Sequence, residues 1–128
     1  MTSNTALRER YLGDTVKTAS PGKLLVMLYD RLVLDLSRGE HALIAGDRSE
    51  ANSQLIHAQE IILELRSSLD TSVWSGGPGL ASLYGFLLTE LVSANINRDA
   101  PRVAACREIV EPLRDAWREA AMATAAAG

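Results

Sequence analysis

Residues 11–30 read YLGDTVKTASPGKLLVMLYD and join a polar segment to a strongly apolar helix. The dipeptide Ser20-Pro21 predicts where that helix begins, because serine is a favoured N-cap and proline is tolerated in the first helical turn. Apolar side chains within 24–34 occupy more than one side of the predicted helix, so most of its circumference must be covered. The segment before it carries three large apolar side chains, Tyr11, Leu12 and Val16. We therefore expect a flexible N-terminal arm, residues 1–19, that covers part of this surface reversibly.

Apolar residues at steps of three and four along the rest of the chain predict further amphipathic helices. The first helix should stop at Gly46, because glycine is favoured just past a helix end. Asp47 then caps the second helix, with Glu50 as a capping-box partner three residues on. The second apolar seam runs over 51–69 and ends at Asp70.

The second half of the chain repeats this pattern after a loop. The stretch TSVWSGGPG at 71–79 reads as that loop, and a third seam follows over 80–94. Asp99 caps a fourth helix, with Pro101 harmless in its first turn. Pro112 falls inside the fourth helix and should bend it, because its ring removes one backbone hydrogen bond.

Four such helices with short links predict an all-α fold, an antiparallel four-helix bundle over residues 20–123. Residues 124–128 should form a frayed tail. The chain has 128 residues, enough for one domain with a sizeable core. Its net charge is −3 with interleaved signs, which argues against a nucleic-acid partner.

The single cysteine, Cys106, excludes an intrachain disulfide and fits a reducing cytoplasm. No signal peptide is recognised, and no apolar run approaches the ~20 residues that span a bilayer. We therefore expect a cytoplasmic protein with no membrane insertion.

Catalytic and metal-binding patterns are not recognised in this sequence. Neither His41 nor His57 follows a glutamate by three residues, as a di-iron bundle requires, and His57 with Glu60 reads as a surface pair. No phosphate-binding loop and no Ser-His-Asp elbow is present. Cys106 lies on an apolar seam and reads as a small buried hydrophobe. We expect no cofactor, no metal and no enzymatic activity.

The helices carry more apolar residues than one seam each requires. Leu24, Met27 and Leu34 flank the first seam, and Ile56, Ile61 and Leu63 flank the second. The third helix adds Leu88, Val92 and Ile96. One interpretation is a wide core, and the other is a groove for a partner helix or segment.

Five motifs, taken in order, identify a family. The chain reads S-P-x-x-L-x-x-M-L-Y-D at 20–30 and A-x-x-I-I-x-E-L-x-x-S-L-D at 58–70. It then reads L-x-x-L-Y at 80–84, L-x-x-A-N-x-x-x-D at 91–99 and L-R-x-A-W at 113–117. Together they resemble the FliS family of bacterial flagellin export chaperones. The chain departs from the family pattern at the shortened 76–84 spacing, at Gly85 and at Pro112.

The resemblance implies a cytoplasmic helical bundle that binds the disordered C-terminal region of flagellin. It implies that such a chaperone prevents premature polymerisation and helps deliver flagellin to an export-gate component of the flagellar type III system. Tyr11 matches the family's N-terminal tyrosine, and the arm could exchange between two copies to form a homodimer. The alternative is a regulatory or scaffold bundle that binds a folded partner. The expected partner-binding residues are Tyr11, Leu12, Val16, Leu24, Met27, Leu34, Ile56, Ile61 and Leu63.

Overall fold

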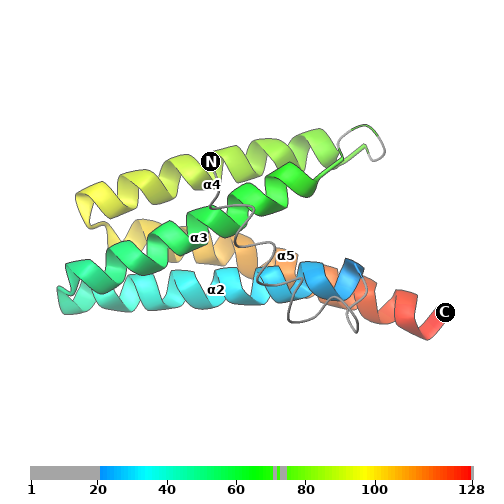
Figure 1. The fold of residues 1–128 in the computed structure, drawn as a ribbon, viewed down its shortest axis with the longest axis horizontal. Helices are drawn as coiled ribbons and strands as arrows, with labels where there is room; N and C mark the ends of the chain where they lie inside the picture. Colours follow the sequence, from blue (N-terminus) through cyan, green and yellow to red (C-terminus); the bar gives the residue numbers. More distant parts are fainter. Residues whose placement is uncertain (1–20, 71, 73–74, 128) are drawn as a thin grey trace.

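The computed structural model describes residues 21–70, 72 and 75–127, with side chains as far as residue 124. This part of the chain folds into four α-helices and contains no strand. The prediction of an all-α four-helix bundle is confirmed (Figure 1). The helices are α2 (Pro21–Ala45), α3 (Arg48–Ser68), α4 (Gly77–Asn97) and α5 (Ala100–Ala127).

The turn between α2 and α3 follows the predicted chemistry. Gly46 has a φ of 77°, in the left-handed region that glycine adopts without steric cost. Oδ1 of Asp47 accepts a hydrogen bond from the backbone N–H of Glu50 at 3.1 Å, which confirms the N-cap. Glu50 does not complete a capping box, because the backbone N–H of Asp47 donates instead to the carbonyl of Ala42 at 2.9 Å, while Glu50 accepts a hydrogen bond from Gln54 at 2.6 Å.

The start of α4 lies earlier than the sequence pattern predicts. The helix begins at Gly77, inside the stretch 71–79 that reads as a loop. Pro78 lies in its first turn, where the missing N–H has no helical partner to lose. The glycines and the proline that indicate a loop are therefore also compatible with a helix start.

The fourth helix, α5, begins at its predicted cap. Oδ1 of Asp99 accepts a hydrogen bond from the N–H of Arg102 at 3.1 Å, and Pro101 lies in the first turn. The helix continues through Pro112 to Ala127, beyond residue 123, where the bundle is predicted to end. Fraying of the last turn stays a prediction.

The core lies between all four helices. In Figure 1, α2 runs along α3 and α5, and α4 completes the bundle against the same two helices. Gly39 permits a close approach of α2 to α3, because a Cβ atom there would lie only 2.7 Å from Cδ2 of Leu55. The largest fully buried side chains are Tyr29, Tyr84, Leu32, Leu36, Leu55, Ile61, Ile62, Leu87, Leu91, Val103, Val110 and Asp35.

Polar contacts join the helices at the periphery of the core. Arg118 of α5 donates a hydrogen bond to Asp30 of α2 at 2.6 Å, and Asn95 of α4 donates one to Asn52 of α3 at 2.9 Å. Such exposed contacts contribute little stability, so the buried apolar residues hold the bundle together.

The expectation that no apolar stretch reaches membrane-spanning length is wrong for α4. By length and composition alone, this 21-residue helix could cross a bilayer. Glu90 is its one charged residue, and uncharged Ser, Thr, Asn and Gly residues interrupt the apolar positions. One such helix is weak evidence for a membrane span, and Leu80, Tyr84, Leu87 and Leu91 of α4 are buried in the bundle.

Candidate binding surface

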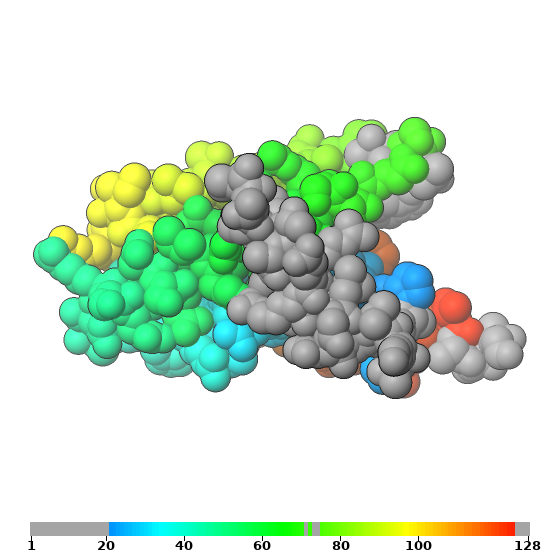
Figure 2. Space-filling model, in the orientation of Figure 1, coloured from blue at the N-terminus to red at the C-terminus, as the bar shows by residue number. Residues whose placement is uncertain are grey.

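An apolar cleft opens where the start of α2 lies beside the end of α5. Its volume is about 480 Å³. The two segments adjoin at one end of the molecule in Figure 2, blue for α2 and red for α5. The cleft is lined by Pro21, Gly22 and Leu25 of α2 and by Trp117, Ala120 and Ala121 of α5.

A second cleft of about 240 Å³ adjoins the first. Leu25 and Trp117 line both clefts and therefore lie between them. The second cleft extends toward α3 and α4, where it is lined by Leu65, Leu80 and Tyr84. All four helices thus contribute to one mostly apolar surface at this end of the bundle.

An ionised carboxylate marks the rim of the second cleft. Oδ1 of Asp70 accepts hydrogen bonds from the hydroxyl of Ser72 at 2.6 Å and from its backbone N–H at 3.0 Å. These two hydrogen bonds lower the pKa of Asp70. The rim therefore carries a negative charge beside an apolar interior.

Small residues shape the first cleft. A Cβ atom on Gly22 would lie 3.5 Å from Cβ of Ala121, so α2 and α5 approach closely at this point. The sequence pattern missed Gly22, Leu25 and the alanines of α5 as lining residues. The signal was the alanine-rich sequence that begins at residue 120, because its small side chains leave room for a cleft where Ala120, Ala121 and Thr124 face the start of α2.

An aromatic cluster lies beneath the two clefts. The hydroxyl groups of Tyr29 and Tyr84 are 2.5 Å apart and buried. The ring of Trp117 lies 6.4 Å from the ring of Tyr29, centroid to centroid, with the planes tilted by 51°. Trp117 lines both clefts and Tyr84 lines the second, so their contacts with the buried Tyr29 give the clefts a fixed shape. An aromatic pair of this geometry contributes about 0.5–1.5 kcal/mol.

Neither tyrosine is suited to acid–base chemistry. Burial raises the pKa of Tyr29, while the hydroxyl of Tyr84 and the indole of Trp117 oppose that effect. Burial also raises the pKa of Tyr84, and the neighbouring Tyr29 raises it further. Both hydroxyls therefore stay protonated at neutral pH and act as hydrogen-bonding groups.

The predicted partner-binding residues divide into three groups. Leu34 and Ile56 are exposed, with 39% and 46% of their surface accessible. Leu24, Met27 and Leu63 are half-buried on the same two helices, α2 and α3. Ile61 is fully buried in the core and adds nothing to the exposed surface. Tyr11, Leu12 and Val16 lie outside the described residues.

The outer side of α4 carries further exposed apolar residues. Val92 and Ile96 belong to the predicted surplus and are 44% and 74% exposed, whereas Leu88 is half-buried. Phe86 is 50% exposed, and the sequence pattern missed it. The sequence feature that could have predicted it is the position of Phe86 next to the buried Leu87, on the side of the helix where a polar residue is usual.

A buried carboxylate joins α2 to α3. Oδ2 of Asp35, which is 0% exposed, contacts Nδ1 of His57, and Oδ1 accepts a hydrogen bond from Nε of Arg31 at 2.9 Å. His57 is therefore more than the member of a surface pair that the sequence predicts. The contact with His57 and the hydrogen bond from Arg31 satisfy Asp35, which would otherwise be costly to bury.

The described residues contain no group of three or more histidine, cysteine or acidic side chains arranged to hold a metal ion. Burial raises the pKa of Cys106 to about 11, so its thiol is protonated and unreactive at neutral pH. The chemistry that the described surface offers is apolar contact, together with hydrogen bonding and charge at its rims.

Four packed helices with open apolar clefts at one end define a helical binding protein. The family model of flagellar protein FliS matches residues 3–124, nearly the whole chain. The chain therefore belongs to the FliS family.

Three curated relatives support this membership, and each is named a flagellar secretion chaperone FliS. The Bacillus subtilis protein is 33% identical over 86% of this chain and 82% of its own length. The Vibrio cholerae protein is 30% identical, with 88% and 83% covered, and the Salmonella typhimurium protein is 30% identical, with 83% and 80% covered.

A solved structure shares the fold. The crystal structure of a flagellar chaperone from bacteria superposes with a TM-score of 0.74, covering 93% of this chain and 98% of that one. The sequence identity is 19%, so the likeness supports the architecture alone.

Proposed function

We propose that this protein is a cytoplasmic chaperone for flagellin. It binds the disordered C-terminal region of flagellin, prevents premature polymerisation and assists delivery to an export-gate component of the flagellar type III apparatus. The proposal makes it a binding protein rather than an enzyme. The observation that carries it is a continuous apolar surface at one end of a bundle whose relatives are flagellar secretion chaperones.

The proposed contacts follow the physics of a helix in a groove. A client helix presents apolar side chains at steps of three and four, which need apolar partners along two neighbouring helices. Leu24, Met27 and Leu34 of α2, with Ile56 and Leu63 of α3, are proposed as such partners along the two helices, although none of them lines either cleft. Tyr11, Leu12 and Val16 are proposed to compete with the client for the same surface.

A calorimetric titration with an isolated flagellin C-terminal peptide tests this function. Binding should show a negative heat-capacity change, because apolar surface is buried, and circular dichroism should report helix gained by the peptide. Met27→Glu and Ile56→Asp should each weaken binding at least tenfold while the protein still folds. The control is Ile44→Asp, an equally drastic change at a 68% exposed position.

Wild-type affinity in both folded variants would place the client elsewhere. The alternative is a scaffold that recognises a folded partner. It would be favoured if the protein bound intact flagellin but the isolated C-terminal peptide gained no helix in the titration. Arm exchange predicts a homodimer, which sedimentation of the full chain and of a chain lacking residues 1–15 would detect.

A further inference from the structure

A polar pocket lies at the opposite end of the bundle from the clefts. Its volume is about 220 Å³, and it is formed where α3 begins and α4 ends. Its polar lining comes from Arg48 and Asn52 of α3 and from Asn95 and Arg98, at the end of α4. Leu43 and Ile96 add apolar surface to the same pocket.

The two arginine side chains of this pocket have no partner in the described part of the chain. Neither Arg48 nor Arg98 makes a side-chain hydrogen bond or an ion pair there. Other arginines of the bundle do: Arg107, for example, pairs with Glu40 at 3.1 Å. Two guanidinium groups thus line one pocket with their donors available.

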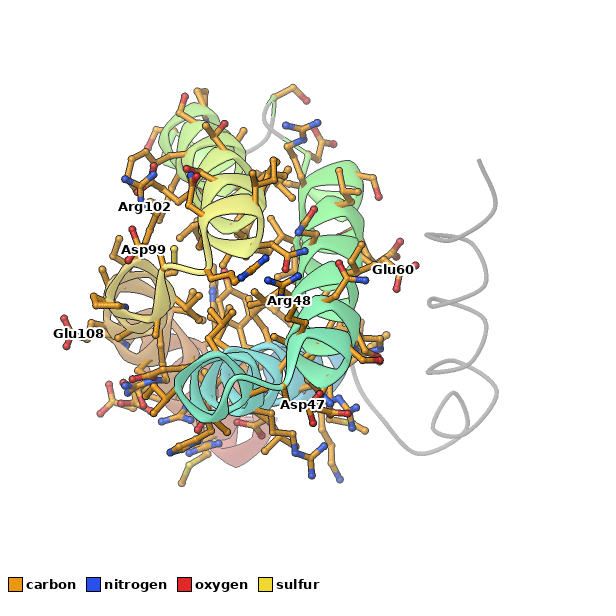
Figure 3. All side chains as sticks on the ribbon, turned by 90° about the vertical axis from the view of Figure 1, so that its left-hand side faces the viewer. Asp47, Arg48, Glu60, Asp99, Arg102 and Glu108 are labelled. Atoms are coloured by element: carbon orange, nitrogen blue, oxygen red, sulfur yellow. The ribbon has the colours of Figure 1, made fainter. Side chains whose placement is uncertain are left out.

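The acidic residues next to the two arginines in sequence, Asp47 and Asp99, have other partners. Asp47 caps α3 through Oδ1, and Asp99 both caps α5 and pairs with Nε of Arg102 at 3.3 Å. Figure 3 looks onto this end and shows Arg48 between the ends of α3 and α4, with Asp47 and Asp99 at separate edges. Neither carboxylate therefore forms an ion pair with the two arginines of the pocket.

The backbone of Arg98 ends α4 and fixes where its side chain begins. Its φ of 52° lies in the left-handed region, and it is the one such non-glycine residue in the described chain. At the neighbouring helix end the same conformation is supplied by Gly46, which adopts it without strain. The left-handed conformation is common where a helix ends, and here it ends α4 at Arg98, whose N–H donates a hydrogen bond to the carbonyl of Ala94.

We propose that this pocket binds a carboxylate carried beside an apolar side chain, as at the C-terminus of a polypeptide. A guanidinium group matches a carboxylate with two parallel hydrogen bonds, and two arginines can hold both oxygens. The hydrogen bond of 2.9 Å from Asn95 to Asn52 fixes the amide groups beside them. Leu43 and the 74% exposed Ile96 provide contact for the adjoining apolar side chain.

Two small probes test this site on the full-length protein. N-acetyl-leucine carries the carboxylate and the apolar side chain, and N-acetyl-leucinamide lacks the charge. NMR titration, followed at the arginine Nε–Hε signals, should show saturable binding of the acid at millimolar concentration and at least fivefold weaker binding of the amide. Equal binding of both probes would overturn the proposal, and so would equally tight binding of inorganic phosphate, which has no apolar part.

Three variants locate the site. Arg48→Gln and Arg98→Gly should each weaken binding of N-acetyl-leucine at least fivefold, and Arg38→Gln, at an exposed site on α2, should not. Arg98→Gly should also unfold at a higher denaturant concentration than wild type, because glycine adopts the φ of 52° without steric cost. Weaker binding by this variant therefore cannot be attributed to unfolding. Unchanged binding in Arg98→Gly would overturn the proposal. The probes do not contain the flagellin segment. Failure of the carboxylate pocket in this test would therefore leave the proposed binding of flagellin untouched, and the reverse also holds.

Discussion

The hydroxyl groups of Tyr29 on α2 and Tyr84 on α4 lie 2.5 Å apart, between helices on opposite sides of the core. Both residues are almost fully buried, so neither hydroxyl has water as a substitute partner. A buried polar group that loses its hydrogen bond costs about 1–3 kcal/mol, more than the net contribution of the bond itself. The pair therefore fixes the relative position of α2 and α4 beneath the clefts.

The first prediction concerns this pair. Tyr29→Phe should lower the free energy of unfolding by about 1–3 kcal/mol, because it leaves the Tyr84 hydroxyl without its partner. Tyr84→Phe should cost less, since Tyr29 still has the indole of Trp117 beside it. The double variant should lose less than the sum of the two, and urea unfolding of all four proteins measures the coupling. Strict additivity would contradict the contact.

The second prediction is a loss of stability at alkaline pH. Burial raises the pKa of both tyrosines above their ordinary value of 10.0. Their contribution to stability is complete below pH 10 and is lost as the pH rises above it, because the unfolded chain releases these protons first. The free energy of unfolding should therefore fall as the pH is raised from about 9.5 to about 11, across the ordinary pKa of tyrosine.

Comparison with the Tyr29→Phe/Tyr84→Phe double variant isolates this effect. Cys106, whose pKa is raised from 9.0 to about 11, destabilises in the same direction above pH 9 in both proteins. The double variant should show the shallower fall, and identical pH profiles would show that the tyrosines titrate normally.

Local chemistry explains which parts of the fold the sequence predicts. The turn at Gly46 and the N-caps at Asp47 and Asp99 depend only on residues within three positions along the chain, so the sequence spacing is enough to predict them. Gly77 and Pro78 suit both a loop and a helix start, and only packing of α4 on its neighbours decides between them.

The candidate site was less predictable because it depends on how helices pair. Asp35 and His57 are 22 residues apart, and they meet only through the register of α2 against α3. The clefts arise where the ends of α2 and α5 meet α3 and α4, and no helical period encodes that arrangement. The surplus apolar residues of α2 and α3 did indicate exposed positions, as Leu34 and Ile56 show.

The third prediction concerns the buried carboxylate. His57→Ala should lower the free energy of unfolding by about 2 kcal/mol, because the buried carboxylate of Asp35 then keeps only the hydrogen bond from Arg31. The matched control is His41→Ala on the exposed side of α2, which should change stability by less than about 0.5 kcal/mol. Thermal and urea unfolding of the two variants compare them directly, and equal losses would show that the contact contributes nothing.

The fourth prediction concerns the N-terminal arm. If residues 1–15 compete with the client, their deletion should tighten binding of the flagellin peptide, because the open fraction of molecules rises. The free protein should also self-associate more, since apolar surface becomes exposed. Tyr11→Ala with Leu12→Ala should act in the same direction to a smaller degree. Weaker peptide binding by the truncated chain would show instead that the arm is itself a contact.

The last prediction uses Trp117, which lines both clefts and packs on the core. In a Trp74→Phe background Trp117 is the single tryptophan, and client binding should shift its fluorescence to shorter wavelength as the clefts lose water. Trp117→Ala should cost about 3–5 kcal/mol of stability, so binding must be compared with a milder change. Trp117→Phe keeps an aromatic ring and should fold, yet weaken peptide binding several-fold because the wall between the clefts becomes smaller. A folded Trp117→Phe protein with wild-type affinity, together with an unshifted Trp117 spectrum, would show that the client does not occupy the clefts.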